Sequence, residues 1–289
     1  MRLLITFLFL QTIFTVILAE FNKSYPTLKI AYKKFKENEH FEVSDYGYVV
    51  YIEASDGIIH KDTFIDIPKI IRFMVYNCNF TSFDLTSLYS MPYLQSIDLM
   101  DVTGLHVLTN KIIVGFKNLK RLSFYQTDIK FDHNTFQNLK QLEYLSIAKV
   151  DVGILGNDVF TGSHLKELYW TDSGIEKIDK YCFSQLKEIE IINLSRNQIE
   201  SLAPETFNGL LMLERLYLNR NKIAYFSSTH FKYLPSLNYL DISENPTENM
   251  RIEEVIKNIP HLKTLIVDRK MISSNFTRDT GTNLSVISV

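Results

Sequence analysis

Apolar residues recur in a fixed pattern along most of the 289-residue chain. A unit whose first, fourth and sixth positions are apolar repeats at intervals of 23 to 25 residues. The units begin at Ile70, Leu94, Leu119, Leu142, Leu165, Ile189, Leu213, Leu237 and Leu262. Period-two alternation over so few residues predicts a short β-strand whose apolar side chains face inward. Because the rest of each unit must return the chain to begin the next strand, we expect stacked parallel strands whose units complete one another's core.

The more regular units continue the pattern beyond the strand, with aliphatic residues at the eleventh and fourteenth positions and Phe at the nineteenth. The unit at Leu213 reads Leu-Glu-Arg-Leu-Tyr-Leu-Asn-Arg-Asn-Lys-Ile. This stretch resembles the LxxLxLxxNxL motif of the extracellular leucine-rich-repeat family, whose repeats have about 24 residues. The resemblance covers about residues 70–275, or about nine repeats. It implies an α/β solenoid, a horseshoe with a parallel β-sheet on the concave face and loops or short helices on the convex face.

The chain departs from the family's pattern at the ninth position, where the family places Asn. Only Asn197, Asn221 and Asn245 comply. A buried Asn amide can satisfy backbone groups in the turn that follows each strand. We therefore expect a regular hydrogen-bonded ladder only over about residues 189–250, and a less regular N-terminal half.

Cysteine usage is the second departure. The family usually closes both ends of the solenoid with disulfide-bonded cysteine clusters, whereas this chain has only Cys78 and Cys182. Four strand spacings separate these two cysteines, about 20 Å, which is too far for a disulfide. We expect two buried thiols, and caps that hold by packing alone.

The N-terminal residues outside the repeats divide into two predicted regions. Residues 1–19 hold Arg2, an apolar run and Ala19, the layout of a cleaved secretory signal peptide, with an uncleaved membrane anchor as the alternative. Residues 20–69 are expected to form an N-terminal cap. It would comprise a hairpin of residues 28–35 with 41–43, then an irregular first strand over 48–52.

At the other end, the helical spacing of Ile252, Val255, Ile256 and Ile259 predicts a short helix on the convex side, ending at Pro260. The segment 276–289 is expected to be a polar C-terminal tail. No segment after the signal peptide is long and apolar enough to predict a membrane span.

Charge and sequons bear on the partner. The formal net charge of −2 gives no electrostatic reason to expect nucleic acid. The chain carries five Asn-x-Ser/Thr sequons, which an exported protein can use as glycan acceptors. They lie at Asn22, Asn79, Asn193, Asn275 and Asn283.

Motifs of catalysis are missing from the sequence. It contains no HExxH, GxSxG, phosphate-binding glycine loop or CxxC, and no two of its seven histidines share helical metal spacing. We therefore predict that the protein is not an enzyme and needs no metal or cofactor.

A binding site is predicted on the strand positions that face the hollow of the horseshoe, which are the third, fifth, seventh and eighth of each unit. Tyr and Arg, which often anchor protein interfaces, gather in these columns. The predicted ligand-binding residues are Tyr76, Tyr125, Tyr144, Tyr169, Tyr217, Tyr239, Arg72, Arg121, Arg215 and Arg220. The alternative is that Tyr, of which the chain has 16, simply suits exposed strands. A glycan at Asn193, a fifth position, would move ligand contact to an edge or to the convex side.

Three functions remain open at this point. The resemblance implies a secreted, extracellular recognition protein that binds a protein or glycan ligand, in innate defence or cell-surface signalling. An extracellular-matrix or self-associating structural protein would form homo-oligomers. A venom or salivary factor would act on another organism.

Overall fold

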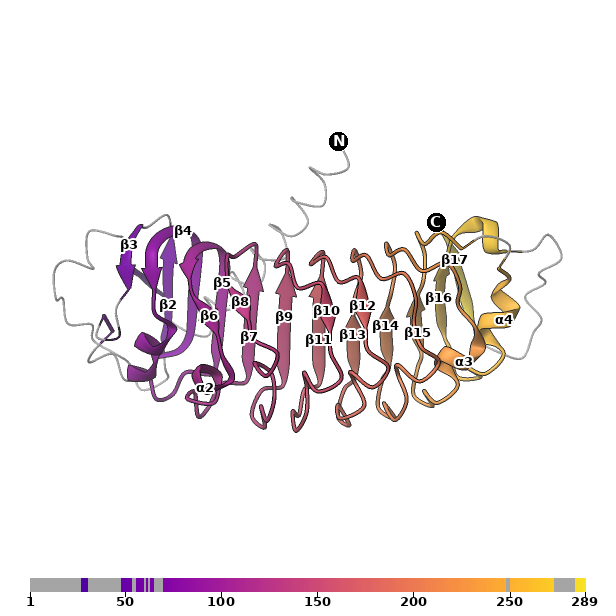
Figure 1. The fold of residues 1–289 in the computed structure, drawn as a ribbon, viewed down its shortest axis with the longest axis horizontal. Helices are drawn as coiled ribbons and strands as arrows, with labels where there is room; N and C mark the ends of the chain where they lie inside the picture. Colours follow the sequence, from indigo (N-terminus) through magenta and orange to yellow (C-terminus); the bar gives the residue numbers. More distant parts are fainter. Residues whose placement is uncertain are drawn as a thin grey trace.

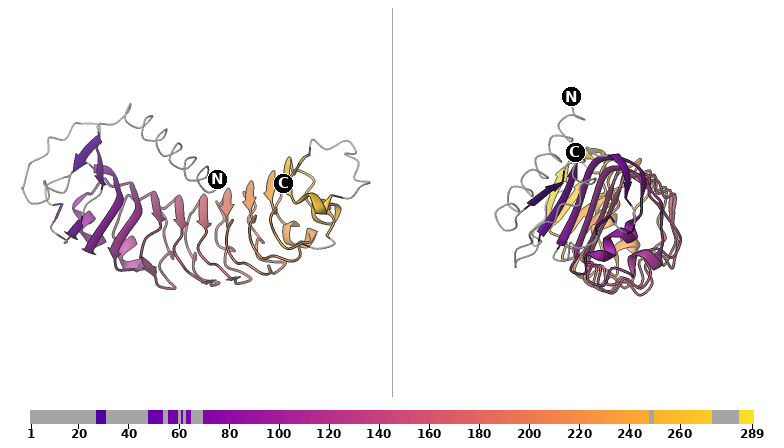
Figure 2. Two further views of the ribbon diagram at one scale, coloured as in Figure 1. Left: turned by 90° about the horizontal axis from the view of Figure 1, so that it is seen from above. Right: turned by 90° about the vertical axis from the view of Figure 1, so that its left-hand side faces the viewer.

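The computed structural model describes residues 27–30, 48–53, 56–59, 61, 63–64, 70–247, 250–272 and 284–289. They form a curved solenoid whose concave side is one parallel β-sheet (Figures 1 and 2). In sheet order the strands are β1 (Thr27–Ile30), β2 (Tyr48–Glu53), β4 (Ile70–Phe83), β5 (Ser96–Leu105), β7 (Arg121–Tyr125), β9 (Tyr144–Ala148), β11 (Glu167–Thr171), β13 (Ile191–Asn193), β14 (Arg215–Tyr217), β15 (Tyr239–Asp241), β16 (Thr264–Val267) and β17 (Ser285–Ser288). The predicted horseshoe fold is confirmed.

Short elements and loops make the convex side. Two small sheets join β6 (Val107–Leu108) to β8 (Lys130–Phe131) and β10 (Ile154–Leu155) to β12 (Lys177–Ile178), whereas β3 (Asp56–Ile59) belongs to the large sheet and pairs with the end of β4. The helical turns are η2 (Leu85–Ser90), α2 (Asn110–Ile113), α3 (Ser228–Phe231), α4 (Ile252–Ile256) and η3 (Arg269–Met271). In the described ranges, none of the helices has the length and apolarity needed to cross a bilayer.

The core runs through the solenoid as stacked columns of apolar side chains. In the unit at Leu213, the first, fourth and sixth positions are fully buried, as the pattern predicts. Phe183 and Phe207, at successive nineteenth positions, stack with centroids 5.9 Å apart. Trp170, at a sixth position, is 1% exposed and packs edge-on against Phe136. Full burial of each large side chain contributes about 1.5–3 kcal/mol, and neighbouring units complete each other's core.

The predicted asparagine ladder is present in the C-terminal half. Asn221 accepts a hydrogen bond from the backbone N–H of Ile199 through Oδ1, and its Nδ2 donates to the carbonyls of Leu194 and Leu218. Asn197 and Asn245 repeat this arrangement one unit on either side. Each amide therefore satisfies backbone groups that the three-residue strands of this half leave unpaired.

The N-terminal half satisfies the same backbone groups in other ways. β4 and β5 continue through the ninth position, so that Cys78 pairs with Val102 in the sheet. At the next turn, the carboxylate of Asp128 accepts hydrogen bonds from the N–H groups of Gly104 and Leu105. In the middle of the solenoid, Ser173 takes the place of Asn, and its hydroxyl accepts a hydrogen bond from the N–H of Val150.

The repeat units share one backbone conformation at the eighth position. The residue at the eighth position has a positive φ, between 50° and 60°, in each of the first eight units. These residues are Asn77, Asp101, Gln126, Lys149, Asp172, Arg196, Arg220 and Glu244. In β4 and β5 this residue lies within the strand, whereas from β7 to β15 it comes after the last strand residue. In all eight units it places a polar side chain without β-branching at the rim of the concave face.

The ends of the solenoid differ in part from expectation. β1 pairs in parallel with β2, whereas the predicted hairpin would pair this segment with residues 41–43, which lie outside the described residues. The signal-peptide segment, most of the predicted cap and residues 276–283 lie outside them as well. The end of the predicted polar tail forms β17, which pairs with β16, because Val286 can pack against the core while Ser285 and Ile287 stay exposed. The helix predicted from Ile252 is present as α4.

Both cysteines lie in the core. Cys78 and Cys182 are buried and are not bonded to each other. Burial raises the pKa of the Cys182 thiol, with a smaller contribution from Asp179. This thiol is therefore protonated at neutral pH and packs as a small apolar group.

Candidate functional site

All the predicted binding strands place their third and fifth positions on the concave face. Strand register aligns Arg121 with Tyr144, and farther along the sheet aligns Arg215 with Tyr239, all at third positions. The predicted tyrosines are half-buried, and Arg121, Arg215 and Arg220 are exposed. The ten residues do not form one cluster, because they divide into a central stack, a C-terminal pair and an N-terminal hollow.

The central stack joins three adjacent strands. The guanidinium carbon of Arg121 lies 3.8 Å above the ring centroid of Tyr144, and the ring of Tyr169 lies 5.4 Å from Tyr144. The hydroxyl of Tyr169 donates to the carboxylate of Glu167 at 3.1 Å. Burial, and then the charge of Glu167, raises the pKa of Tyr169, so its phenol stays protonated across the physiological range. Packing thus fixes the orientation of Arg121 before any ligand arrives.

The C-terminal pair consists of Tyr217 and Tyr239, whose ring centroids lie 4.9 Å apart. Beside them, burial raises the pKa of Asp241, although its Oδ1 accepts hydrogen bonds from the N–H and hydroxyl of Ser243. At the rim, Arg220 is held in an ion pair with Glu244 at 2.6 Å. The rim cation Arg220 is therefore already neutralised by a neighbouring strand.

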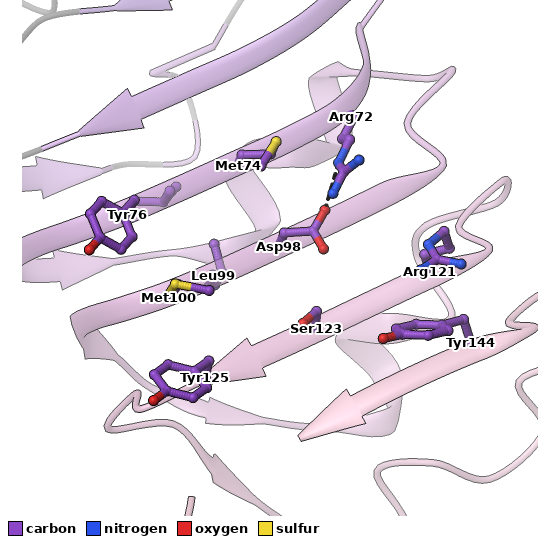
Figure 3. A pocket seen from close by; sticks show the side chains of 11 residues that line it. Arg72, Met74, Tyr76, Asp98, Leu99, Met100, Arg121, Ser123, Tyr125 and Tyr144 are labelled. Carbon is purple, nitrogen blue, oxygen red and sulfur yellow. Dashed lines mark hydrogen bonds and ion pairs between the residues drawn. The ribbon is translucent and has the colours of Figure 1, made fainter. Parts of the chain in front are cut away.

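The N-terminal hollow is a cavity of about 150 Å³ between β4, β5, β7 and β9 (Figure 3). Its lining includes five of the ten predicted residues, which are Arg72, Tyr76, Arg121, Tyr125 and Tyr144. Arg72 pairs with Asp98 at 2.9 Å, and Ser96 donates a hydrogen bond to the same carboxylate oxygen. Met74 and Met100 give the hollow an apolar surface between these polar groups.

The two methionines were missed in the sequence. Met74 occupies a fifth position and Met100 a seventh position, and both positions also hold predicted tyrosines in other units. A search for apolar residues at these positions would have found the two methionines. Tyr125 was predicted, and the ammonium of Lys149 lies 4.9 Å from its ring centroid. Among the described residues, no group of three or more His, Cys, Asp or Glu side chains is arranged to hold a metal ion.

Two of the five sequon asparagines lie in described parts of the chain. Asn79 is an exposed residue of β4 and accepts a hydrogen bond from the hydroxyl of Thr103. Asn193 lies in β13, in register between Tyr169 and Tyr217, and its Oδ1 accepts a hydrogen bond from the N–H of Ser195. Asn22, Asn275 and Asn283 lie outside the described residues.

The sequence matches one protein-family model in two overlapping stretches. The model described as "Leucine rich repeat" matches residues 163–223 and 190–247. These matches fall on the half of the solenoid that carries the asparagine ladder.

Curated relatives match over longer stretches. Human Toll-like receptor 3 is 27% identical over 212 residues, which cover 67% of this chain and 23% of that protein. Bovine Toll-like receptor 4 is 24% identical over 86% of this chain and 28% of that protein, and chicken lumican is 30% identical over 50% of this chain and 41% of that protein. The chain therefore spans about a quarter of the length of the Toll-like receptors that it matches.

Two solved structures share the fold. The TLR13–ssRNA13 complex aligns with a TM-score of 0.66 and 21% identity, covering 83% of this chain and 40% of that chain. The FLRT2 leucine-rich-repeat complex with latrophilin 3 and Unc5D aligns with a TM-score of 0.61 and 16% identity, covering 86% and 85%.

Proposed function

The chain belongs to the leucine-rich-repeat family, and from that premise we propose that it is a secreted protein that recognises a protein ligand through its concave face. The observation that carries the proposal is the recurrence of partly or fully exposed Tyr and Arg side chains on the concave side of six strands, which are β4, β7, β9, β11, β14 and β15. Tyr offers a large amphipathic contact at small entropic cost, and Arg adds directional hydrogen bonds. Concave surfaces of such solenoids commonly serve as extended binding sites, which supports a non-catalytic role.

Charge favours a protein over a nucleic acid as the ligand. Among solved structures of this fold, FLRT2 is found with other proteins and TLR13 with single-stranded RNA, so the shared fold does not choose between these two ligands. A nucleic-acid site needs an excess of cations, but here Arg72 and Arg220 are paired with carboxylates of neighbouring strands. Glycan remains a possible ligand where a tyrosine ring face is open. Secretion is supported by the layout of residues 1–19 and by the extracellular relatives.

The first test is whether the protein is secreted and N-glycosylated. Cells that express the full chain should release it into the medium, and a glycosidase that removes N-linked glycans should increase its gel mobility. Retention of all the protein in the cell membrane would contradict secretion and favour the anchor.

The second test asks which face binds. Tagged wild-type protein and the Tyr217→Ala/Tyr239→Ala variant are cross-linked to extracellular fluid and cell surfaces, and captured partners are quantified. The matched control is Tyr181→Ala/Tyr225→Ala, which removes two exposed tyrosines from outside the strands. We expect the concave variant alone to lose partners by about tenfold. Loss in the control variant alone would contradict the concave face.

Self-association is the alternative that a solution measurement separates most directly. Light scattering of the purified protein should report a monomer if the concave face is reserved for another ligand. A stable homo-oligomer that the concave variant dissociates would favour the structural role.

A further inference from the structure

The N-terminal hollow differs from the rest of the concave face in carrying an oriented cation without a carboxylate partner. Arg72 and Asp98 neutralise each other at 2.9 Å, whereas Arg121 makes no ion pair with any described residue. The hollow therefore has one net positive charge. Because Arg121 rests on the ring of Tyr144, its hydrogen-bonding edge is held in place at the mouth of the cavity.

Beside this cation lies an apolar surface. Met74 is almost fully buried, Met100 is half-buried, and both line the hollow with Ser123. A cavity of about 150 Å³ is large enough to hold one benzene-sized group. Methionine adapts readily to the shape of such a group.

The polar groups are arranged along the strands. Figure 3 shows Arg121 toward the start of its strand and Tyr125 toward its end, with Ser123 between them. From the third to the seventh position, a strand covers about 13 Å. An occupant that contacts both ends must therefore be an extended segment of about four residues.

We propose that this hollow binds an extended peptide segment in which an acidic side chain lies next to an apolar one. The carboxylate pairs with Arg121, the apolar side chain enters the hollow against Met74 and Met100, and the Tyr125 hydroxyl hydrogen-bonds the peptide backbone. This assignment rests on the proposed function, because it names the ligand chemistry of the same concave face.

Two observations favour a peptide over an anionic sugar or an RNA. The ring of Tyr144 lies between Arg121 on one neighbouring strand and Tyr169 on the other, so neither of its faces is open for a sugar or base to stack. A single net charge also gives little attraction for a polyphosphate backbone.

The test starts from a displayed library of linear peptides selected on the wild-type protein. Selected peptides should share an Asp or Glu adjacent to a Phe, Leu or Met. In titration of one synthetic peptide, Arg121→Gln and a Glu→Gln change in the peptide should each weaken binding by about tenfold. The two changes together should weaken binding no further than either alone, because each removes the same ion pair.

Two further variants separate the site from general damage. Ser123→Leu should fill the hollow and weaken binding by about tenfold without changing the midpoint of thermal unfolding. Arg251→Gln, an exposed arginine outside the concave strands, should leave peptide affinity unchanged. Two results would contradict the assignment. One is that the losses of binding free energy from Arg121→Gln and from the Glu→Gln change in the peptide add together. The other is that Ser123→Leu leaves peptide affinity unchanged.

The outcomes also distinguish this inference from the proposed function. If the selected peptides bind at Tyr217 and Tyr239 and Arg121→Gln does not change their affinity, the proposed function is retained. The assignment of the peptide site to the N-terminal hollow is then wrong. A heparin fragment or a poly(U) oligonucleotide that binds more tightly than every selected peptide, and does so through Arg121, would overturn the peptide assignment.

Discussion

The two halves of the solenoid complete the same backbone hydrogen bonds by different means. In the N-terminal half, β4 has 14 residues and β5 has 10, and main-chain pairing continues past the ninth position. In the C-terminal half, β13, β14 and β15 have three residues each, and the Asn ladder supplies the missing partners. The backbone groups that follow each concave strand must have hydrogen-bond partners. The asparagine of the family is one way to provide them, and longer strands are another.

The halves also differ on the concave face. The N-terminal half presents a hollow with an unmatched arginine, whereas the cation at the C-terminal rim is paired with Glu244. The half with the less regular repeat thus carries the more distinctive binding chemistry.

The largest expected effect comes from removing the central amide of the ladder. Asn221→Ala should lower the free energy of unfolding by about 3 kcal/mol, because it leaves several buried backbone groups unsatisfied. Cys78→Ala, at the same position of the first unit, should cost only about 1 kcal/mol, since main-chain pairing remains. Urea unfolding compares the two, and equal losses would remove the distinction between the halves.

A smaller effect should come from extending the ladder by one unit toward the N-terminus. Ser173 lies beside Asn197 and already accepts a hydrogen bond from the N–H of Val150. Ser173→Asn should raise the free energy of unfolding by about 1 kcal/mol, and Ser173→Ala should lower it by a similar amount. If the Asn variant is less stable than the Ala variant, the middle of the solenoid cannot hold the ladder.

Mild acid should weaken the C-terminal half through His230. This side chain is buried, its Nδ1 accepts the N–H of Ser227, and its Nε2 is hydrogen-bonded to the carbonyl of Leu202. Burial lowers the pKa of His230 below its ordinary value of 6.5. The unfolded chain therefore takes up the proton first, so stability is full above pH 6.5 and falls as the pH drops from there toward the lower folded pKa.

Hydrogen exchange at pH 7.5 and 5.5 measures this effect locally. Protection around α3 should decrease at the lower pH, while β4 and β5 should change less. His230→Gln should abolish the difference in α3. A pH response that persists in this variant would assign the titration to another group.

The sequence predicts the core well because the repeat period determines which side chains face inward. The burial of the first, fourth and sixth positions, Trp170 among them, follows from spacing alone. The extent of the ladder follows from the resemblance to the family, which places Asn at the ninth position. The hollow cannot be predicted from spacing, because its shape depends on the packing of side chains from four different strands. In particular, the stacking of Arg121 on Tyr144 sets which cation is available, and no pattern within one unit specifies that contact.

The ends were harder to predict for a related reason. β17 lies outside the run of repeats, so no period identifies it, and only pairing with β16 shows that Val286 belongs to the core. β1 likewise obtains its partner from a strand that begins 18 residues after it ends.

The left-handed residue at the eighth position of the first eight units has a consequence for how this surface can change. A β-branched side chain is strained in that conformation, and none of the eight residues there is β-branched. Variation at the rim is therefore restricted to Gly, Asn, Asp and other unbranched polar residues. A combinatorial library that seeks new specificities should omit Val, Ile and Thr from these eight codons and place its aromatic diversity one residue earlier, where the backbone is extended.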